Sequence, residues 1–219
     1  MKTVMENLEP QSLWRHFEAL SAIPRASEKE AAARRYVLAQ AARLGLESTT
    51  DGVGNIVVRK PARPGREGAV GAVLQGHLDM VCEKNEGTVH NFDTDPIRLV
   101  REGDWLKADG TTLGADNGVG VAAALAVMES AEVAHGPLEF LFTIDEESGL
   151  TGAAQFRWTA PGQILPQPGR RGRGNAVHRL RGRAQYGSAA QSSVPRSSGR
   201  RSVVHQGVRF AGRALRHRH

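Results

Sequence analysis

The sequence predicts an α/β fold with a largely parallel sheet and helices on both of its faces. Two observations lead to this prediction. Apolar runs typical of strands alternate, over the first 150 residues, with segments whose apolar residues recur at helical spacing. The chain also has 219 residues, 40% of them hydrophobic, which is enough to fill the core of one large domain or two small ones.

Three segments have the pattern of helices. The first follows Pro10, which suits a first helical position, and its apolar stripe consists of Leu13, Trp14, Phe17 and Leu20. The second opens at residues 27–30, where Ser27 and Glu30 have the spacing of a capping box, and Gly45 can close it. The third, residues 117–129, is rich in Ala and Val and carries its one charge at the far end, as a buried helix would.

Five segments have the pattern of strands. Residues 55–59 and 69–75 are β-branched or small apolar runs, and residues 137–144 form another apolar run. Residues 97–100 and 105–108 are separated by three polar residues and one glycine, which predicts a hairpin. Strands and helices therefore alternate along the chain, and we see no internal repeat.

Cysteine content and hydropathy limit the classes of protein to which the chain can belong. The single cysteine, Cys82, excludes an internal disulfide framework and suits a reducing compartment. Residues 1–6 lack the apolar core of a signal peptide, and no run approaches the ~20 apolar residues of a membrane span. We therefore expect a cytoplasmic protein with no membrane partner.

The net charge of +6 hides an uneven distribution. Up to Glu147 there are 23 acidic residues against 15 Lys and Arg, whereas residues 148–219 contain 14 Arg, no Lys and no acid. One explanation is a basic arm for nucleic acid, because long blocks of like charge often behave as interaction tails. The other explanation is that this segment was never selected as protein.

The first chemical motif follows the strand at 69–75. His77 and Asp79 point to the same side of an extended chain, and a carboxylate beside an imidazole is the usual support of a metal-bound histidine. Taken alone the motif is weak, because an ordinary surface His–Asp pair would look the same.

The second motif is a glycine-rich stretch around Asp116, which leads into the third helix. Asp116 could cap this helix, and the glycines at 114, 118 and 120 could belong to a phosphate loop. However, the Gly-Lys-Ser/Thr ending of such a loop is missing, and a carboxylate in a phosphate cradle would repel its ligand. A cation is the better partner.

The third motif is the run Asp145–Glu146–Glu147 at the end of an apolar strand. Clustered carboxylates repel one another, so a buried or partly buried cluster needs protons or cations. Together with His77 and Asp116, the two glutamates form a plausible ligand set for two divalent ions, in which one carboxylate bridges and another stays free to take a proton. Neighbouring side chains diverge, so Glu146 and Glu147 could divide the roles of base and ligand. The competing interpretation is a solvated acidic turn.

Three blocks of the chain resemble those of the cytosolic aminoacyl-histidine dipeptidases, which are zinc metallopeptidases. They are QGHLDMVCEKN (residues 75–85), DGTTLGADNGVGVA (109–122) and FTIDEESGLTGA (142–153), and the block SLWRHFEALSAIPRAS (12–27) fits the same family. The resemblance covers residues 8–156. It implies a zinc-peptidase catalytic domain and hydrolysis of a dipeptide substrate, often one with C-terminal histidine.

The resemblance also implies roles for individual residues. His77 and Glu147 would each bind one of two zinc or other divalent ions, and Asp116 would bridge them. Glu146 would be the general base, and Asp79 would orient His77. The family also has a non-proline cis peptide after the bridging Asp, here between Asp116 and Asn117. Other than these metals, no cofactor is implied.

The chain departs from the family after residue 156. The family has a further Asp ligand, an inserted dimerisation domain and a last metal-binding His, but residues 164–174 contain no acid and no later His lies in a family motif. We therefore expect the catalytic domain to be incomplete at its C-terminal side, with residues 1–165 as its N-terminal part and 166–219 as an Arg-rich, poorly packed tail. The region through which the family forms homodimers would be absent.

A frameshift near Leu165 would explain the tail. Read one base later, the codons of GRRGRG (residues 169–174) admit Asp, Ala, Glu, Asp and Glu, the acidic segment that the family has here. Because ligands would be missing, we expect weak or absent activity and doubtful occupancy of both metal positions. Independent sequencing of the gene tests this hypothesis: it fails if the present frame is confirmed and the alternative frame encodes no acidic segment.

The alternative from another class is a protein that binds nucleic acid or other polyanions through the Arg-rich tail. The tail has few aromatic residues for stacking on bases, namely Trp158, Tyr186 and Phe210, and no recognisable binding module. We therefore expect no specific nucleic-acid partner, only salt-sensitive binding that does not depend on sequence.

Overall fold

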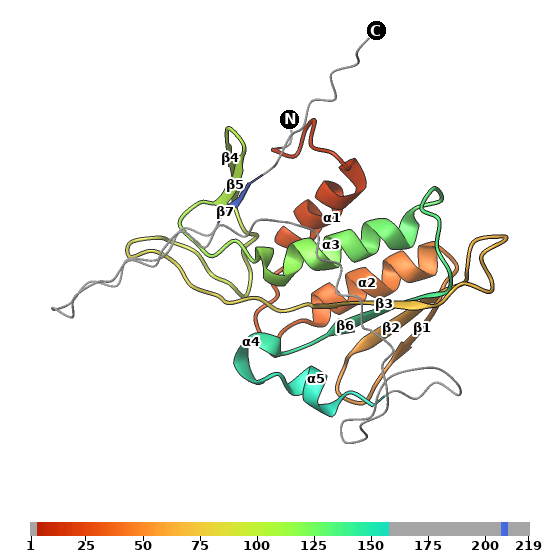
Figure 1. The fold of residues 1–219 in the computed structure, drawn as a ribbon. Coiled ribbons are helices and arrows are strands. Elements are labelled where there is room, and N and C mark those ends of the chain that lie inside the picture. Colours follow the sequence, from red (N-terminus) through yellow and green to blue (C-terminus); the bar gives the residue numbers. More distant parts are fainter. Residues whose placement is uncertain (1–3, 158–206, 210–219) are drawn as a thin grey trace, which may run out of the picture.

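A computed structural model describes residues 4–157 and 207–209 of the chain. Its larger sheet has four strands in the order β1-β2-β6-β3 (Figure 1), with bounds β1 (Glu47–Thr50), β2 (Ile56–Lys60), β3 (Ala72–His77) and β6 (Leu138–Thr143). Three helices lie over one face of this sheet: α1 (Gln11–Ser21), α2 (Ala31–Arg43) and α3 (Ala115–Glu129). Two short helices, α4 (Glu146–Gly149) and α5 (Thr151–Gln155), follow β6. The predicted α/β class is confirmed.

The strand directions differ from the prediction of a largely parallel sheet. Only β3 and β6 run parallel, whereas β1 pairs antiparallel with β2 and β2 antiparallel with β6. The tight turn at residues 51–55 explains the antiparallel pairing of β1 with β2, because a short connection can join only antiparallel neighbours. In this turn Asp51 Oδ1 accepts backbone N–H groups from Val53, Gly54 and Asn55. Helices α1, α2 and α3 share one face, so the prediction of helices on both faces is not met by these three.

The core fills the space between the three helices and the sheet. Phe140 and Phe142 alternate along β6 and therefore point to the same face, opposite Val58 and Ile56 of β2. All four are completely buried, as are Phe17 of α1 and Leu125 of α3. Gly45 adopts φ +65 after α2, which is the left-handed conformation that closes helices.

A second, smaller sheet contains the predicted hairpin of β4 (Leu99–Glu102) and β5 (Trp105–Ala108). Its third strand, β7 (Gly207–Arg209), pairs antiparallel with β5. These three residues are the part of the Arg-rich tail that the structure describes. Their pairing with β5 was not expected from the sequence, which predicts a poorly packed tail. The rest of the tail lies outside the described residues.

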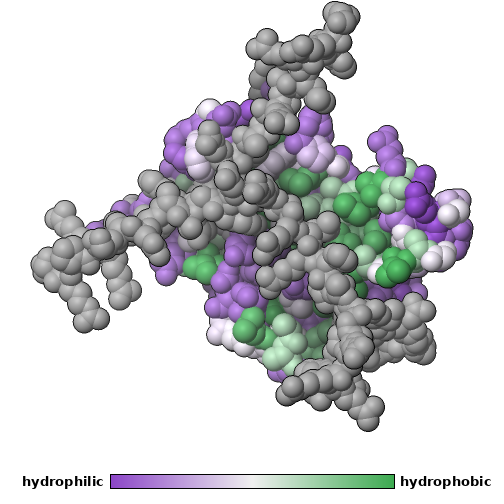
Figure 2. All heavy atoms as spheres, in the orientation of Figure 1, coloured by the Kyte–Doolittle hydropathy of each residue, from purple (hydrophilic) through white to green (hydrophobic). Residues whose placement is uncertain are grey.

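The described surface is mixed in polarity. In Figure 2 hydrophobic areas lie among hydrophilic ones on the face shown. The exposed large apolar residues come from six separate segments, at Val70, Val81, Val89, Trp105, Val133 and Leu150. Among the helices that the structure describes, none has the length and hydrophobicity needed to cross a membrane.

A cluster of polar side chains connects helices α1, α2 and α3. Glu129 of α3 accepts hydrogen bonds from Arg15 of α1 and Arg43 of α2. His16 of α1 is buried, with Nδ1 2.7 Å from the Tyr36 hydroxyl and Nε2 3.3 Å from the Glu129 carboxylate. Burial is the main cause that lowers the pKa of His16 below its ordinary value, although Glu129 opposes this effect.

The lowered pKa of His16 predicts acid destabilisation. Below the ordinary histidine pKa of 6.5 the unfolded chain binds a proton that the folded chain does not, so unfolding is favoured as the pH falls. We expect the free energy of unfolding to fall more steeply from about pH 6.5 downward in the natural chain than in a His16→Gln variant. Urea unfolding at a series of pH values measures both slopes. Equal slopes would contradict the burial of a neutral imidazole at this position.

Candidate metal centre

The candidate centre lies where β3 and β6 end side by side. The two strands are parallel, and the last pair in their register is His77 with Thr143, so His77 lies next to the turn that carries Asp145, Glu146 and Glu147. This is the edge of an α/β sheet where ligands usually bind. The two strand-end motifs of the sequence are therefore brought together.

The N-terminus of α3 brings the motif around Asp116 to the same place. Gly76 permits this approach, because a Cβ there would lie 2.9 Å from Asn117 Oδ1 and 3.1 Å from the Val121 side chain. Asp116 and Asn117 have non-helical backbone angles inside α3, and the peptide bond between them is cis, as the resemblance implied. Asp116 Oδ1 lies 3.2 Å from His77 Nε2.

One set of side chains in the described residues could hold a metal ion: His77, Asp116 and Glu147. Each offers a ligand atom, and these atoms lie within 4.8 Å of one another. The His77 side chain is 6% exposed, whereas that of Asp116 is 70% exposed. The imidazole thus forms the floor of the site, and the carboxylates stand on its solvent side.

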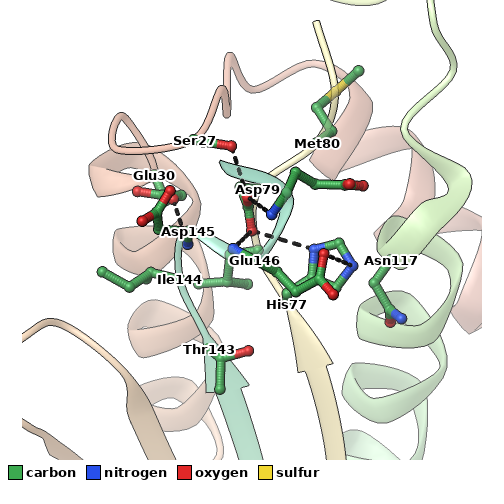
Figure 3. A network of polar contacts seen from close by, with 12 residues as sticks. Ser27, Glu30, His77, Asp79, Met80, Asn117, Thr143, Ile144, Asp145 and Glu146 are labelled. Carbon is green, nitrogen blue, oxygen red and sulfur yellow. Dashed lines mark hydrogen bonds and ion pairs between the residues drawn. The ribbon is translucent and has the colours of Figure 1, made fainter. Parts of the chain in front are cut away.

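Glu146 lies beside these three residues without belonging to the set. Its carboxylate is 3.9 Å from His77 Nε2 and 37% exposed. Figure 3 shows Glu146 and His77 close together beyond the ends of β6 and β3, with Asp79 above them and joined by dashed lines to both.

Asp79 is completely buried and holds both strand ends together. Its Oδ1 lies 3.2 Å from His77 Nδ1 and accepts the backbone N–H of Glu146, and its Oδ2 accepts the N–H of Glu147 and the Ser27 hydroxyl. Burial alone would raise the pKa of Asp79, but these hydrogen bonds hold it well below its ordinary value. Asp79 is therefore a carboxylate that stays charged.

The contact with Asp79 decides how His77 presents its ring. A proton on Nδ1 is held by Asp79, so the lone pair of Nε2 faces Asp116 and the solvent side of the site. Burial alone would lower the pKa of His77, but the hydrogen bonds to Asp79 and Asp116 raise it above its ordinary value. The site thus attracts a positive charge at Nε2.

The pKa of Glu147 also indicates an excess of negative charge in the site. Its pKa is raised, first by burial and then by the charges of Asp116, Glu146 and Asp79, which His77 only partly offsets. A carboxylate in this position is stabilised by a nearby cation. Protein ligands lie about 2.0–2.2 Å from zinc, so two ligands of one tetrahedral ion are about 3.3–3.6 Å apart. The 3.2 Å between His77 Nε2 and Asp116 Oδ1 is close to this spacing, so the donor set fits a divalent ion.

Asp145 does not join the two glutamates. It adopts φ 48, is 6% exposed, and donates its N–H to Glu30 Oε1 (Figure 3). The three adjacent acids are thus divided: Asp145 is buried, while the carboxylates of Glu146 and Glu147 lie near His77.

The predicted capping box at Ser27 and Glu30 is wrong. Helix α2 begins at Ala31, and neither side chain caps it. Ser27 donates to Asp79, and Glu30 Oε1 accepts the N–H groups of Asp145 and Glu28. Both residues support the candidate centre. Their spacing, which resembles a capping box, gave no sign of this role in the sequence.

A cavity of about 340 Å³ opens beside the candidate centre. His77, Asp116 and Glu146 form its charged side, and the rest of its lining consists of Gln75, Asn117, Leu141, Thr143, Leu150, Ala153 and Phe156. A second cavity, of about 370 Å³, lies at the turn around Asp51, and its lining includes none of the candidate metal ligands. The chemistry therefore belongs to the first cavity.

Comparison with known proteins agrees with the resemblance found in the sequence. Residues 73–176 match peptidase family M20/M25/M40, a match that ends beyond Leu165. The chain is 49% identical over 149 residues to the cytosol non-specific dipeptidase of Escherichia coli strain K12, which is 68% of this chain and 31% of that protein.

Solved structures with the same fold include two peptidases. The aminoacylhistidine dipeptidase from Vibrio alginolyticus superimposes with a TM-score of 0.69 at 47% identity, over 70% of this chain and 31% of that chain. Aminopeptidase PepT from Bacillus cereus superimposes with a TM-score of 0.54 at 26% identity, over 67% of this chain and 39% of that chain. The chain thus spans about a third of the length of these relatives.

Proposed function

Because the chain belongs to peptidase family M20/M25/M40, we propose that it serves metal-dependent hydrolysis of dipeptides. The observation that carries the proposal is the convergence of His77, Asp116 and Glu147, with Glu146 beside them, at the shared end of two parallel strands. The relatives reported above are named as peptidases, two of them as dipeptidases.

His77, Asp116 and Glu147 would hold the metal, and Asp79 would fix the orientation of His77. When bound, a divalent ion polarises the scissile carbonyl and favours deprotonation of water. We propose zinc or another divalent ion at two positions, bridged by Asp116. Support for the bridge is the 70% exposure of the Asp116 side chain, which leaves its second oxygen open away from His77.

Glu146 has the geometry of a general base. Its backbone N–H donates to Asp79, and its side chain lines the cavity with its carboxylate 3.9 Å from His77 Nε2. A carboxylate in this place can take a proton from the attacking water and pass it to the leaving amine as the C–N bond breaks. Asp79 and Glu146 thus divide the work of orientation and proton transfer.

The cavity beside His77 would receive the dipeptide. Gln75, Asn117 and Thr143 offer hydrogen bonds, whereas Leu141, Leu150 and Phe156 offer an apolar wall. Mixed linings of this kind suit peptides, which carry both backbone polar groups and side chains. By analogy with the cytosol dipeptidase of E. coli, we also propose a cytoplasmic location.

An assay with dipeptides, including those with C-terminal histidine, tests the proposal. We expect slow hydrolysis that requires added zinc and is lost in a Glu146→Gln variant that still binds the metal. Hydrolysis that persists in this variant, or in the presence of a chelator, would overturn the assigned chemistry. The E. coli relative assayed in parallel sets the scale.

We further propose that residues 1–165 are the N-terminal part of the catalytic domain and residues 166–219 are a separate, Arg-rich tail. The support is the abrupt loss of acids after Glu147 together with coverage of 31% of the E. coli relative. A slow rate is expected because three metal ligands are few for a two-metal site. The alternative of polyanion binding through the tail receives no support from the relatives reported above, which are peptidases.

A further inference from the structure

We propose that Arg25 positions the candidate metal centre by tying together the two segments that carry His77 and Asp116. Arg25 lies in the loop between α1 and α2 and is 2% exposed. Its Nη1 donates to the carbonyl oxygens of Leu78 at 3.1 Å and Asp79 at 3.0 Å, and its Nη2 donates to the carbonyl oxygen of Gly114. The inference rests on the proposed metal centre.

These bonds act on residues next to the ligands. Leu78 directly follows His77, and Gly114 lies two residues before Asp116. One guanidinium therefore fixes the distance between the end of β3 and the start of α3. That distance sets the 3.2 Å between His77 Nε2 and Asp116 Oδ1.

The backbone around Arg25 is built to admit the guanidinium. Gly114 has φ +66, and a Cβ there would lie 2.4 Å from Arg25 Nη2. A Cβ on Gly118, one turn into α3, would lie 2.8 Å from the same atom. Two of the glycines that suggested a phosphate loop thus make room for a protein cation.

The same loop supports the rest of the centre. The Arg25 carbonyl accepts the N–H of Met80, Ala26 forms a parallel bridge with Met80, and Ser27 donates to Asp79. Arg25 therefore stands at the middle of a segment that contacts every ligand-bearing element: β3 and α3 directly, and the Glu146–Glu147 turn through Asp79.

The chemistry of Arg explains why this residue type suits the position. Its planar fork presents several N–H groups in a fixed geometry, so it can donate to carbonyls on two segments at once. A Lys ammonium is a compact charge on a flexible stem and cannot hold the same spacing. The pKa of Arg25 is lowered to about 10, chiefly by burial, so the group remains charged at neutral pH.

The test compares Arg25→Lys with Lys60→Met as a matched control. Lys60 is also a cation that donates to two backbone carbonyls, those of Val127 and Ser130, but it does so at the opposite end of α3. Both variants lose interelement hydrogen bonds, and only Arg25→Lys loses them next to the metal ligands. A purely structural role would make the two variants behave alike.

Two readouts are used. In Co²⁺ titrations followed by absorption, the Arg25→Lys chain should bind the ion about tenfold or more weakly than the natural chain. Changing a residue that supports a metal ligand commonly has an effect of this size. In the metal-free chain, the amides of Glu146 and Glu147 should exchange with deuterium about tenfold faster in Arg25→Lys. Lys60→Met should leave both quantities as in the natural chain.

Exchange in the metal-free chain separates the two proposals. If the natural chain fails to bind Co²⁺ at His77, the proposed function fails, and the exchange rates still decide the role of Arg25. A second variant, Gly118→Ala, keeps Arg25 but pushes on its guanidinium, and should also speed exchange at Glu146 and Glu147. Unchanged exchange and affinity in Arg25→Lys and Gly118→Ala, or equal effects in Lys60→Met, would overturn the positioning role.

Discussion

Replacement of Asp79 by Asn is expected to weaken metal binding by about 10–100-fold, the usual effect of changing a residue that supports a metal-bound histidine. It should also lower the free energy of unfolding by about 2–5 kcal/mol, because hydrogen bonds to a charged group contribute about 1.5–3 kcal/mol each. Asp79 is completely buried, so water cannot replace what is lost.

The reason lies in the four donors around the carboxylate. Each oxygen accepts two hydrogen bonds: Oδ1 faces His77 and the Glu146 amide, and Oδ2 faces Ser27 and the Glu147 amide. Asn replaces one oxygen with an NH₂ group, which would point N–H bonds at two donors whichever way it turns. Both His77 and the acidic turn would lose their fixed positions.

Asp95→Asn is the matched control for this prediction. Asp95 also accepts a backbone N–H, from Asn91, and a hydroxyl, from Thr94, but it lies in an exposed loop. This variant should leave Co²⁺ affinity unchanged. Calorimetric titration and urea unfolding measure the two effects, and an Asp79→Asn chain with natural metal affinity would contradict the assigned role.

Replacement of Phe142 by Ala should cost about 3–5 kcal/mol of stability, the usual cost of removing a buried aromatic side chain. Phe142 is completely buried on β6, one of the two inner strands, opposite Ile56 of β2. Whole domains are commonly stable by only about 5–15 kcal/mol, so the variant should be close to unfolded. Because β6 leads directly into Glu146 and Glu147, metal binding should be lost with the fold.

Val133→Ala serves as the control for the core prediction. Val133 is 43% exposed and follows the end of α3, so its truncation should change the free energy of unfolding by less than about 0.5 kcal/mol. Urea unfolding followed by circular dichroism measures both variants. Equal stability of Phe142→Ala and the natural chain would show that β6 is not the centre of the core.

Strong local patterns allowed much of the fold to be predicted from the sequence. Phe140 and Phe142 alternate as in a strand, the third helix is rich in Ala, and the hairpin turns at Gly103. Each of these patterns favours one kind of secondary structure. Strand β1 was missed because its four residues are polar and all exposed, so no alternation marks it. Without β1, the antiparallel half of the sheet could not be foreseen.

The candidate site, too, could be predicted only in part. His77, Asp116 and Glu147 come together as predicted, because strand ends and a helix N-terminus are recognisable in sequence. The partners that hold them could not be predicted. Arg25 and Glu30 act through contacts with residues 53 to 115 positions away in the chain, and no local pattern records such contacts.

Co²⁺ titration of the purified natural chain and of a His77→Ala variant tests the central claim most directly. The variant is needed because the tail contains four further histidines, His178, His205, His217 and His219. We predict that the natural chain binds at least one Co²⁺ ion with an absorption spectrum that the His77→Ala chain lacks. Identical titration curves for the two chains would contradict a metal centre at the ends of β3 and β6.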